Sequence, residues 1–170
     1  ESVAERVAAC VHWGDQRTVD QDPAFGVQQL VDVALRAMSP GINDPSTACQ
    51  CIDRLATILV RLGNRAPPKR HHCSDGQLRL VTHPADFGTL LSLAFEAVVA
   101  HCRGDIQVLQ RIVNALRSIE RMTRQPERRR ELHTTLRDTV VELRRVRPRH
   151  RARHVLQQAL ALRARLHDVS

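Results

Sequence analysis

The chain has 170 residues, with 26 Lys and Arg against 18 Asp and Glu, and its aromatic side chains are three Phe and one Trp. This length suits one domain, with or without a small appendage. So few aromatic residues leave no stacking platform for single-stranded nucleic acid. No apolar run reaches the roughly 18–20 residues that cross a bilayer, so we expect no membrane-spanning segment within the chain.

Charge is distributed unevenly along the sequence. Residues 1–60 hold four Arg and eight acids, a net charge of −4, whereas residues 61–170 hold 22 Lys and Arg and ten acids, a net charge of +12. A basic half of this kind favours an acidic partner, such as anionic lipid headgroups, an acidic protein or nucleic acid. The five cysteines are odd in number, which favours reduced thiols in a cytosolic setting. Because residue 1 is Glu, we expect the chain to be a fragment or a processed form.

The first half of the sequence predicts three helices. Residues 2–13 repeat apolar side chains at helical spacing. Two longer helices, over 22–38 and 44–62, each begin with Asp-Pro, which places an acidic cap before a proline at the first helical position. Ser-Pro-Gly at 39–41 ends the first of them, and we expect the glycine to take the positive φ of a turn. Residues 17–62 are therefore predicted to form an αα-hairpin.

The second half predicts a short hairpin and four more helices. Residues 77–83 alternate like a strand and could pair with part of 68–73. The next helix, 87–102, is apolar on nearly every side, which is typical of the centre of a bundle. Further helices are predicted over 106–123, from Pro126 and from Pro148. We thus predict a mostly α fold of about seven helices with a β-hairpin near 68–83. A core domain, 1–124, would carry an Arg-rich helical pair, 125–170, packed on it or extending from it.

No recognisable catalytic motif is present, and the sequence implies no cofactor. Cys49 and Cys51 diverge by about 200° on a helix, so we interpret Cys51 as a core residue rather than as half of a zinc pair. His71, His72 and Cys73 can all ligate metals, but no second pair of ligands stands at a standard offset. We interpret this stretch as a loop.

The segment RTVDQD, residues 17–22, is the first candidate for a binding site. Asp20 and Asp22 form a D-x-D pair of the kind that can hold a divalent cation. The alternative is structural, with Asp22 capping the helix and Asp20 paired with Arg17. Arg17 could equally clamp an anion, because its guanidinium matches carboxylate and phosphate groups.

The segment SPGINDPSTA, residues 39–48, is the second candidate. Its simplest interpretation is a helix-to-helix corner in which Asp44 caps the following helix. The alternative is an anion site at a helix N-terminus, with extra polar groups from Ser39, Asn43 and Thr47. The candidate ligand-binding residues of both segments are Arg17, Gln21, Asp22, Ser39, Asn43, Asp44 and Thr47.

The segment RPRHRARH, residues 147–154, carries a basic surface patch made of Arg147, Arg149, Arg151 and Arg153. Such a patch could contact nucleic acid or lipid headgroups. The alternative is a helix whose arginines are simply solvated.

Residues 17–55 closely resemble the signature segment of a bacterial family of predicted membrane proteins, catalogued as domain of unknown function 2254. The resemblance rests on R-T-x-x-Q-D-P-x-F-G followed by L-V-D-x-A-x-R-A-x-S-P-G-I-N-D-P-x-T-A, with Met38 in place of an expected Leu. Weaker similarity at 75–80 and 86–91 extends towards residue 120. The matching positions are Arg17, Gln21, Asp22, Pro23, Phe25, Gly26, Asp32, Arg36, Ser39, Pro40, Gly41, Asn43, Asp44, Pro45 and Thr47.

This resemblance implies attachment to a membrane but assigns no reaction. We expect a cytoplasmic regulatory or assembly domain of an integral membrane protein, partnered by upstream transmembrane segments, by anionic lipid headgroups or by a second copy of the chain. A first alternative is an anion- or metal-dependent binding or catalytic module centred on the segments 17–22 and 39–47. A second is duplex DNA binding through the basic C-terminal helix, which the sequence favours least.

Overall fold

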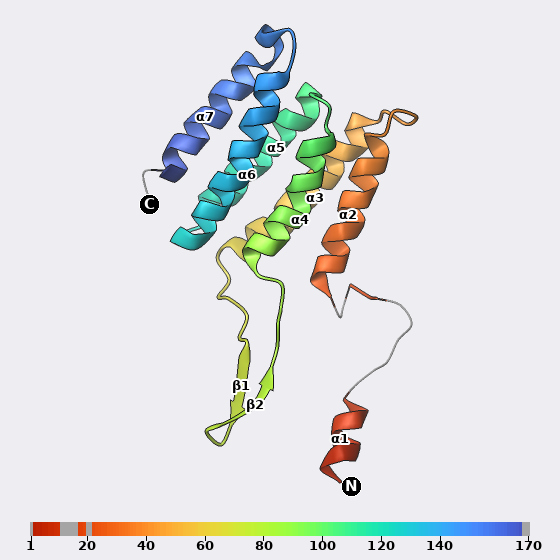
Figure 1. The fold of residues 1–170 in the computed structure, drawn as a ribbon, viewed down its shortest axis with the longest axis vertical. Coiled ribbons are helices and arrows are strands. Elements are labelled where there is room, and N and C mark those ends of the chain that lie inside the picture. The colour runs from red at the N-terminus through yellow and green to blue at the C-terminus, as the bar shows by residue number, and fades with distance from the viewer. Residues whose placement is uncertain (1, 11–16, 20–21, 168–170) are drawn as a thin grey trace.

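The computed structural model describes residues 2–10, 17–19 and 22–167, and it shows a stack of helices with one projecting β-hairpin (Figure 1). The helices are α1 (Val3–Ala9), α2 (Pro23–Ala37), α3 (Pro45–Gly63), α4 (Phe87–His101), α5 (Ile106–Met122), α6 (Pro126–Arg145) and α7 (Arg153–His167). The strands are β1 (His71–Ser74) and β2 (Gln77–Val81), and a 3-10 turn, η1 (Arg149–Ala152), precedes α7. The predicted mostly α fold of about seven helices with a short hairpin is confirmed.

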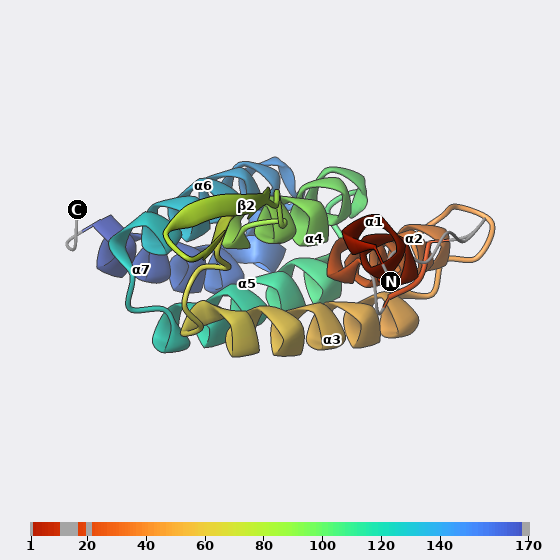
Figure 2. The same ribbon diagram turned by 90° about the horizontal axis from the view of Figure 1, so that it is seen from below.

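Six of the helices form three consecutive αα-hairpins that stack side by side. The pairs α2–α3, α4–α5 and α6–α7 each contact the next pair, so α2, α4 and α6 make one layer and α3, α5 and α7 the other (Figures 1 and 2). Helical-repeat proteins use the same scheme, in which each pair buries an apolar face that it could not bury alone. We call the end at which α2, α4 and α6 begin the strand end, since β1 and β2 project there. The opposite end is the corner end.

Local capping explains where four of these helices begin. The carboxylates of Asp22, Asp44, Asp86 and Asp105 each accept a hydrogen bond from backbone N–H groups in the first turn of α2, α3, α4 and α5. These bonds satisfy donors that have no partner within the helix itself. The two predicted Asp-Pro starts are therefore confirmed, with proline in the first turn of α2 and of α3.

The turn between α2 and α3 differs from its prediction in one respect. The residue with positive φ is Asn43, at 48°, and Gly41 has no positive φ. Asn43 donates its backbone N–H to the Ser39 carbonyl at 2.8 Å, and Asp44 donates to the Ala37 carbonyl at 2.8 Å. The left-handed residue thus lies immediately before the cap. Asn is one of the few residues other than glycine that tolerates this conformation, because its short polar side chain bonds locally.

The core is aliphatic apart from Phe87 and Phe95. Its largest fully buried side chains are Phe95, Ile52, Leu55, Leu59, Leu91, Leu109, Ile112, Leu116, Ile119, Leu132, Leu136 and Leu143. Helix α4 was expected to be surrounded, but Ser92, Glu96 and Ala100 form an exposed stripe along it. The stacking of hairpins explains this difference, since a two-layer stack leaves one side of every helix uncovered.

The C-terminal pair is packed against the rest of the stack. Helix α6 contacts α4 and α5, and α7 contacts α5 and α6. Gln110 of α5 donates to the Gln158 amide oxygen of α7 at 2.8 Å, which is a polar tie between these neighbours. Pro148 precedes η1, and α7 itself begins at Arg153, later than the sequence predicted.

Candidate functional site

The start of α2 is a compact charged cluster. Asp22 forms an ion pair with Arg17 and accepts a hydrogen bond from the Ala24 N–H at 2.9 Å. The Arg17 guanidinium lies 5.5 Å from the centre of the Phe25 ring, a cation–π distance. The hydrogen bond from Arg17 is the main cause that lowers the pKa of Asp22 below its ordinary value. Asp20 and Gln21 lie outside the described residues, so the D-x-D metal pair stays a prediction.

The corner before α3 is closed by its own polar groups. Asp44 accepts hydrogen bonds from the Thr47 hydroxyl at 2.6 Å and from the N–H groups of Ser46 and Thr47 at 3.0 and 3.1 Å. The Thr47 hydroxyl is the main cause that lowers the pKa of Asp44. These bonds occupy the helix N-terminus that the anion-site hypothesis needs, so the local geometry is that of a capped corner.

The structure does not bring the two candidate segments together. Arg17 and Asp22 lie at the strand end, whereas Ser39, Asn43, Asp44 and Thr47 lie at the corner end. The 15 residues of α2 separate them, which corresponds to about 22 Å along the helix axis. Arg17 contacts Asp22 instead of Asp44. A site that uses both segments would therefore need a second molecule.

A cavity of about 580 Å³ opens beside Asp22, and we call it the strand-end pocket. Its wall is built from the first turns of α2, α4 and α6, the last turn of α3 and the two segments that lead to and from the hairpin. The lining is mostly apolar, and its residues are Asp22, Pro23, Leu62, Arg65, Ala66, Pro68, His83, Pro84, Ala85, Phe87, Leu90 and Arg128. Small-molecule sites have about this volume and this kind of lining.

Arg128 is a residue of this pocket that the sequence analysis did not single out. It is 7% exposed, and its Nη1 donates to the carbonyls of Leu62, Gly63 and Arg65 at 3.0, 2.9 and 2.9 Å. The guanidinium also lies 5.2 Å from the centre of the Phe87 ring. One side chain from α6 thus satisfies the C-terminal carbonyls of α3 and covers the start of α4.

Glu131, one turn further along α6, lies over Gly88. A methyl group added at Gly88 would come within 2.5 Å of Glu131 Oε1. Glu131 Oε2 is buried and accepts no hydrogen bond from the described residues. Burial, followed by the nearby Asp86 carboxylate, raises the pKa of Glu131, which the charge of Arg128 opposes. The ionised form of the Glu131 carboxylate is therefore poorly stabilised by its surroundings.

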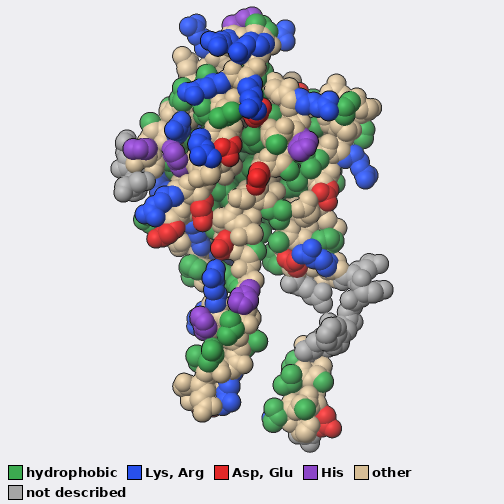
Figure 3. Space-filling view, viewed as in Figure 1, with side chains coloured by type: hydrophobic (Ala, Val, Ile, Leu, Met, Phe, Trp, Pro, Cys, Tyr) green, Lys and Arg blue, Asp and Glu red, His purple; other side chains and the backbone are tan. Residues whose placement is uncertain are grey.

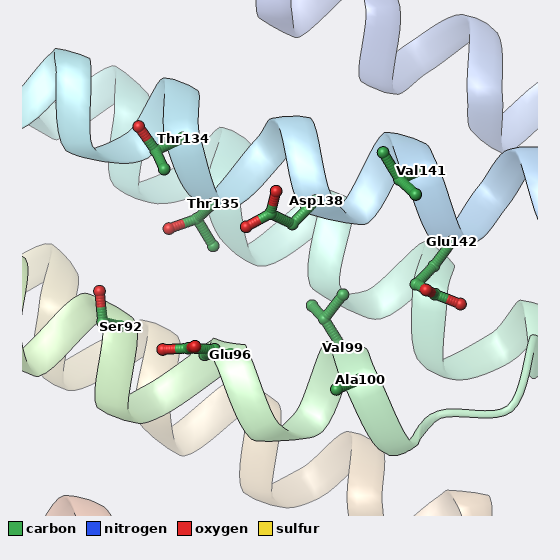
Figure 4. A pocket seen from close by; sticks show the side chains of 9 residues that line it. All are labelled: Ser92, Glu96, Val99, Ala100, Thr134, Thr135, Asp138, Val141 and Glu142. Atoms are coloured by element: carbon green, nitrogen blue, oxygen red, sulfur yellow. The ribbon is translucent and has the colours of Figure 1, made fainter.

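A second cavity, of about 400 Å³, is a groove between α4 and α6 (Figure 4). Figure 4 shows the side chains of Glu96 from α4 and Asp138 and Glu142 from α6 along it, with Val99 and Val141 nearby. Figure 3 shows several acidic side chains on this face of the molecule, interspersed with Lys and Arg. Glu142 is paired with Arg145 at 2.5 Å, which offsets part of this charge.

The predicted basic patch lies at the corner end, away from the strand-end pocket. Arg147, Arg149, Arg151 and Arg153 are all exposed around η1, and Lys and Arg side chains gather there in Figure 3. Arg147 donates to the Arg144 carbonyl at 2.8 Å.

The cysteines and histidines assemble no metal centre in the part of the chain that the structure describes. All five cysteines are free thiols, and burial raises the pKa of Cys51 and Cys102. Cys51 belongs to the core, as predicted. His71, His72 and Cys73, which were interpreted as a loop, instead belong to the strand β1, where Cys73 is exposed.

Comparison with known proteins identifies relatives but no activity. The family described as "Predicted membrane protein (DUF2254)" matches residues 1–118. Uncharacterized proteins of Mycobacterium bovis and of two Mycobacterium tuberculosis strains are 32% identical over 134 residues, which cover 78% of this chain and 26% of each relative. The chain thus spans about a quarter of the length of these relatives. No solved structure matches it.

The hydropathy of the helices adds one fact to these comparisons. Among the described residues, no helix combines the length and the apolar character that crossing a bilayer requires. The longest charge-free apolar stretch of α4 ends at Glu96, which lies in the groove.

Proposed function

Because the chain belongs to the DUF2254 family of predicted membrane proteins, we propose that it is an extramembrane regulatory or assembly domain of a membrane protein, placed on the cytoplasmic side. The observation that carries this proposal is the combination of family and fold. The relatives are about four times as long as the matched region, and no described helix of this chain can span a bilayer.

Cysteine chemistry supports the cytoplasmic side. Free thiols persist in a reducing compartment, and all five cysteines here are free. This observation does not depend on where the membrane-spanning segments lie in the sequence.

The sidedness is tested by labelling Cys73 in the full-length protein. Cys73 is exposed on the projecting hairpin, so a membrane-impermeant maleimide reaches it whenever the domain faces the reagent. We expect Cys73-dependent labelling in lysed cells and none in intact cells, with Cys73→Ser as the matched control. Cys73-dependent labelling in intact cells would place the domain outside and contradict the proposal.

A role in assembly or regulation is tested in the same protein. The stack of hairpins presents an uncovered layer formed by α2, α4 and α6, and the acidic groove between α4 and α6 in this layer is suited to a basic partner segment. We expect reversal of its charge by Glu96→Lys with Asp138→Lys to change the oligomeric state of the full-length protein in mild detergent. The exposed pair Asp32→Lys with Asp53→Lys, on α2 and α3, is the control. An unchanged oligomeric state in the groove variant would show that the groove has no role in assembly.

A further inference from the structure

We propose that the strand-end pocket binds an amphipathic anion, a molecule with a phosphate or carboxylate head and a short apolar body. This goes beyond membrane attachment, since the pocket belongs to the folded domain itself. Nothing in the family or its relatives assigns such a site.

The apolar part of the ligand is inferred from the walls. Leu62, Phe87 and Leu90 line the pocket from α3 and α4, together with three prolines, Pro23, Pro68 and Pro84. A volume of about 580 Å³ accommodates a molecule larger than a bare phosphate ion. Pockets of this size bury most of the surface of their ligands, so an apolar body gains affinity by leaving water.

The anionic head is inferred from the charges on the same walls. Arg65, Arg128 and His83 line the pocket, and the single acid among its described lining residues, Asp22, is already paired with Arg17. Arginine is suited to this task because its planar guanidinium donates two parallel hydrogen bonds to a phosphate or carboxylate.

Arg128 is held in place before any ligand arrives. Its Nη1 is committed to three backbone carbonyls, and the ring of Phe87 lies beside the guanidinium. No hydrogen bond occupies its Nε or Nη2 among the described residues, and the side chain still lines the pocket. A donor fixed in this way loses little conformational freedom on binding, which is the advantage of a preorganised site.

The binding test uses the purified 170-residue chain and isothermal titration calorimetry. Octyl phosphate is the probe, inorganic phosphate lacks the apolar body, and octanol lacks the charge. We expect octyl phosphate to bind with one-to-one stoichiometry and at least about tenfold more tightly than either partial probe, a factor that corresponds to one good interaction. Equal binding of octanol would overturn the anionic head, and absence of octyl phosphate binding would overturn the site.

Two variants locate the ligand without removing Arg128, which also ties the fold together. Ala85 is exposed at the pocket wall, so Ala85→Trp fills the cavity, whereas Ala164→Trp places the same side chain on the exposed face of α7. Arg65→Ala removes a lining charge just after α3, and Arg61→Ala removes an exposed charge from the last turn of α3. We expect loss of binding for Ala85→Trp and about tenfold weaker binding for Arg65→Ala, with both controls unchanged. Binding that survives Ala85→Trp would place the ligand elsewhere.

The same chemistry could come from a lipid headgroup or from a soluble metabolite, and vesicles distinguish these sources. The chain is sedimented with phosphatidylcholine vesicles with and without phosphatidylglycerol. Sedimentation that requires phosphatidylglycerol and is lost in Ala85→Trp supports the site and identifies a lipid. Binding of octyl phosphate without sedimentation supports the site and identifies a soluble anion as the ligand. If the chain neither binds octyl phosphate nor sediments with vesicles, the proposed site is overturned.

Discussion

Replacement of Arg128 by Ala tests whether one side chain holds the strand end of the stack together. The three carbonyls that it satisfies belong to Leu62 and Gly63 at the end of α3 and to Arg65 just after it, 63 to 66 positions away in sequence. Because Nη1 carries two protons, we count two full hydrogen bonds from a charged donor, each contributing about 1.5 kcal/mol at the lower end of the usual range. The contact with Phe87 adds about 1 kcal/mol.

The expected loss for Arg128→Ala is therefore about 4 kcal/mol in the free energy of unfolding. For a domain of this size, that corresponds to a fall of roughly 8–16 °C in the melting temperature. Urea unfolding followed by circular dichroism measures the first quantity, and calorimetry measures the second. Arg128→Lys should recover only part of the loss, because an ammonium group lacks the planar fork that reaches several carbonyls and covers a ring.

Arg130→Ala is the matched control, since Arg130 is exposed on the same helix. We expect it to change the free energy of unfolding by less than about 0.5 kcal/mol, as surface substitutions usually do. A loss below about 1 kcal/mol for Arg128→Ala would refute the reasoning. It would mean that the α3 carbonyls find water or another donor at no cost.

Three further predictions concern the turn between α2 and α3 and the carboxyl groups of Asp44 and Glu131. Asn43→Ala should destabilise the protein by about 1 kcal/mol in urea unfolding, because alanine is strained at positive φ. Asn43→Gly and Gly41→Ala should be nearly neutral in the same assay. Equal losses of stability for Gly41→Ala and Asn43→Ala would contradict the assignment of positive φ to Asn43. Asp44 has a folded-state pKa below its unfolded value of about 3.9, so the stability it contributes is present above that pH and is lost as pH falls. The urea concentration at the unfolding midpoint should therefore be lower at pH 3 than at pH 6, and this difference should be smaller in Asp44→Asn than in the unmodified protein. An equal difference in the two proteins would exclude a contribution from this cap. Glu131 has the opposite sign, because its raised pKa gives stability that is present at low pH and is lost as pH rises. Glu131→Gln should raise the urea midpoint at pH 7 and leave it almost unchanged near pH 3.5, and a lower midpoint at pH 7 would show that the ionised carboxylate has a partner.

Helix starts were predictable because their determinants lie within three residues of one another. Asp22-Pro23 and Asp44-Pro45 specify a cap and a first turn without help from the rest of the chain. The hairpin was predictable for the same reason, since alternation in 77–81 and the Asp75-Gly76 turn are local features. The turn was assigned to Gly41 in error because Gly and Asn both tolerate positive φ, and the sequence does not say which of two candidates takes it.

The strand-end pocket was not predictable, because its walls meet only after the hairpins stack. Arg128 is the first of three consecutive arginines, and nothing local distinguishes it from the exposed Arg130. Its role depends on the three carbonyls around position 63, whose position relative to α6 is a property of the tertiary fold. The separation of Arg17 from Asp44, by contrast, follows from the predicted αα-hairpin, because antiparallel α2 and α3 begin at opposite ends.

Whether this domain belongs to a membrane-embedded protein is tested by fractionating cells that express either the full-length protein or the 170 residues alone. After membranes are washed with alkaline carbonate, we expect the full-length protein to stay in the membrane pellet and the 170-residue chain to stay in the supernatant. A full-length protein released into the supernatant, or a 170-residue chain retained in the washed pellet, would contradict this expectation.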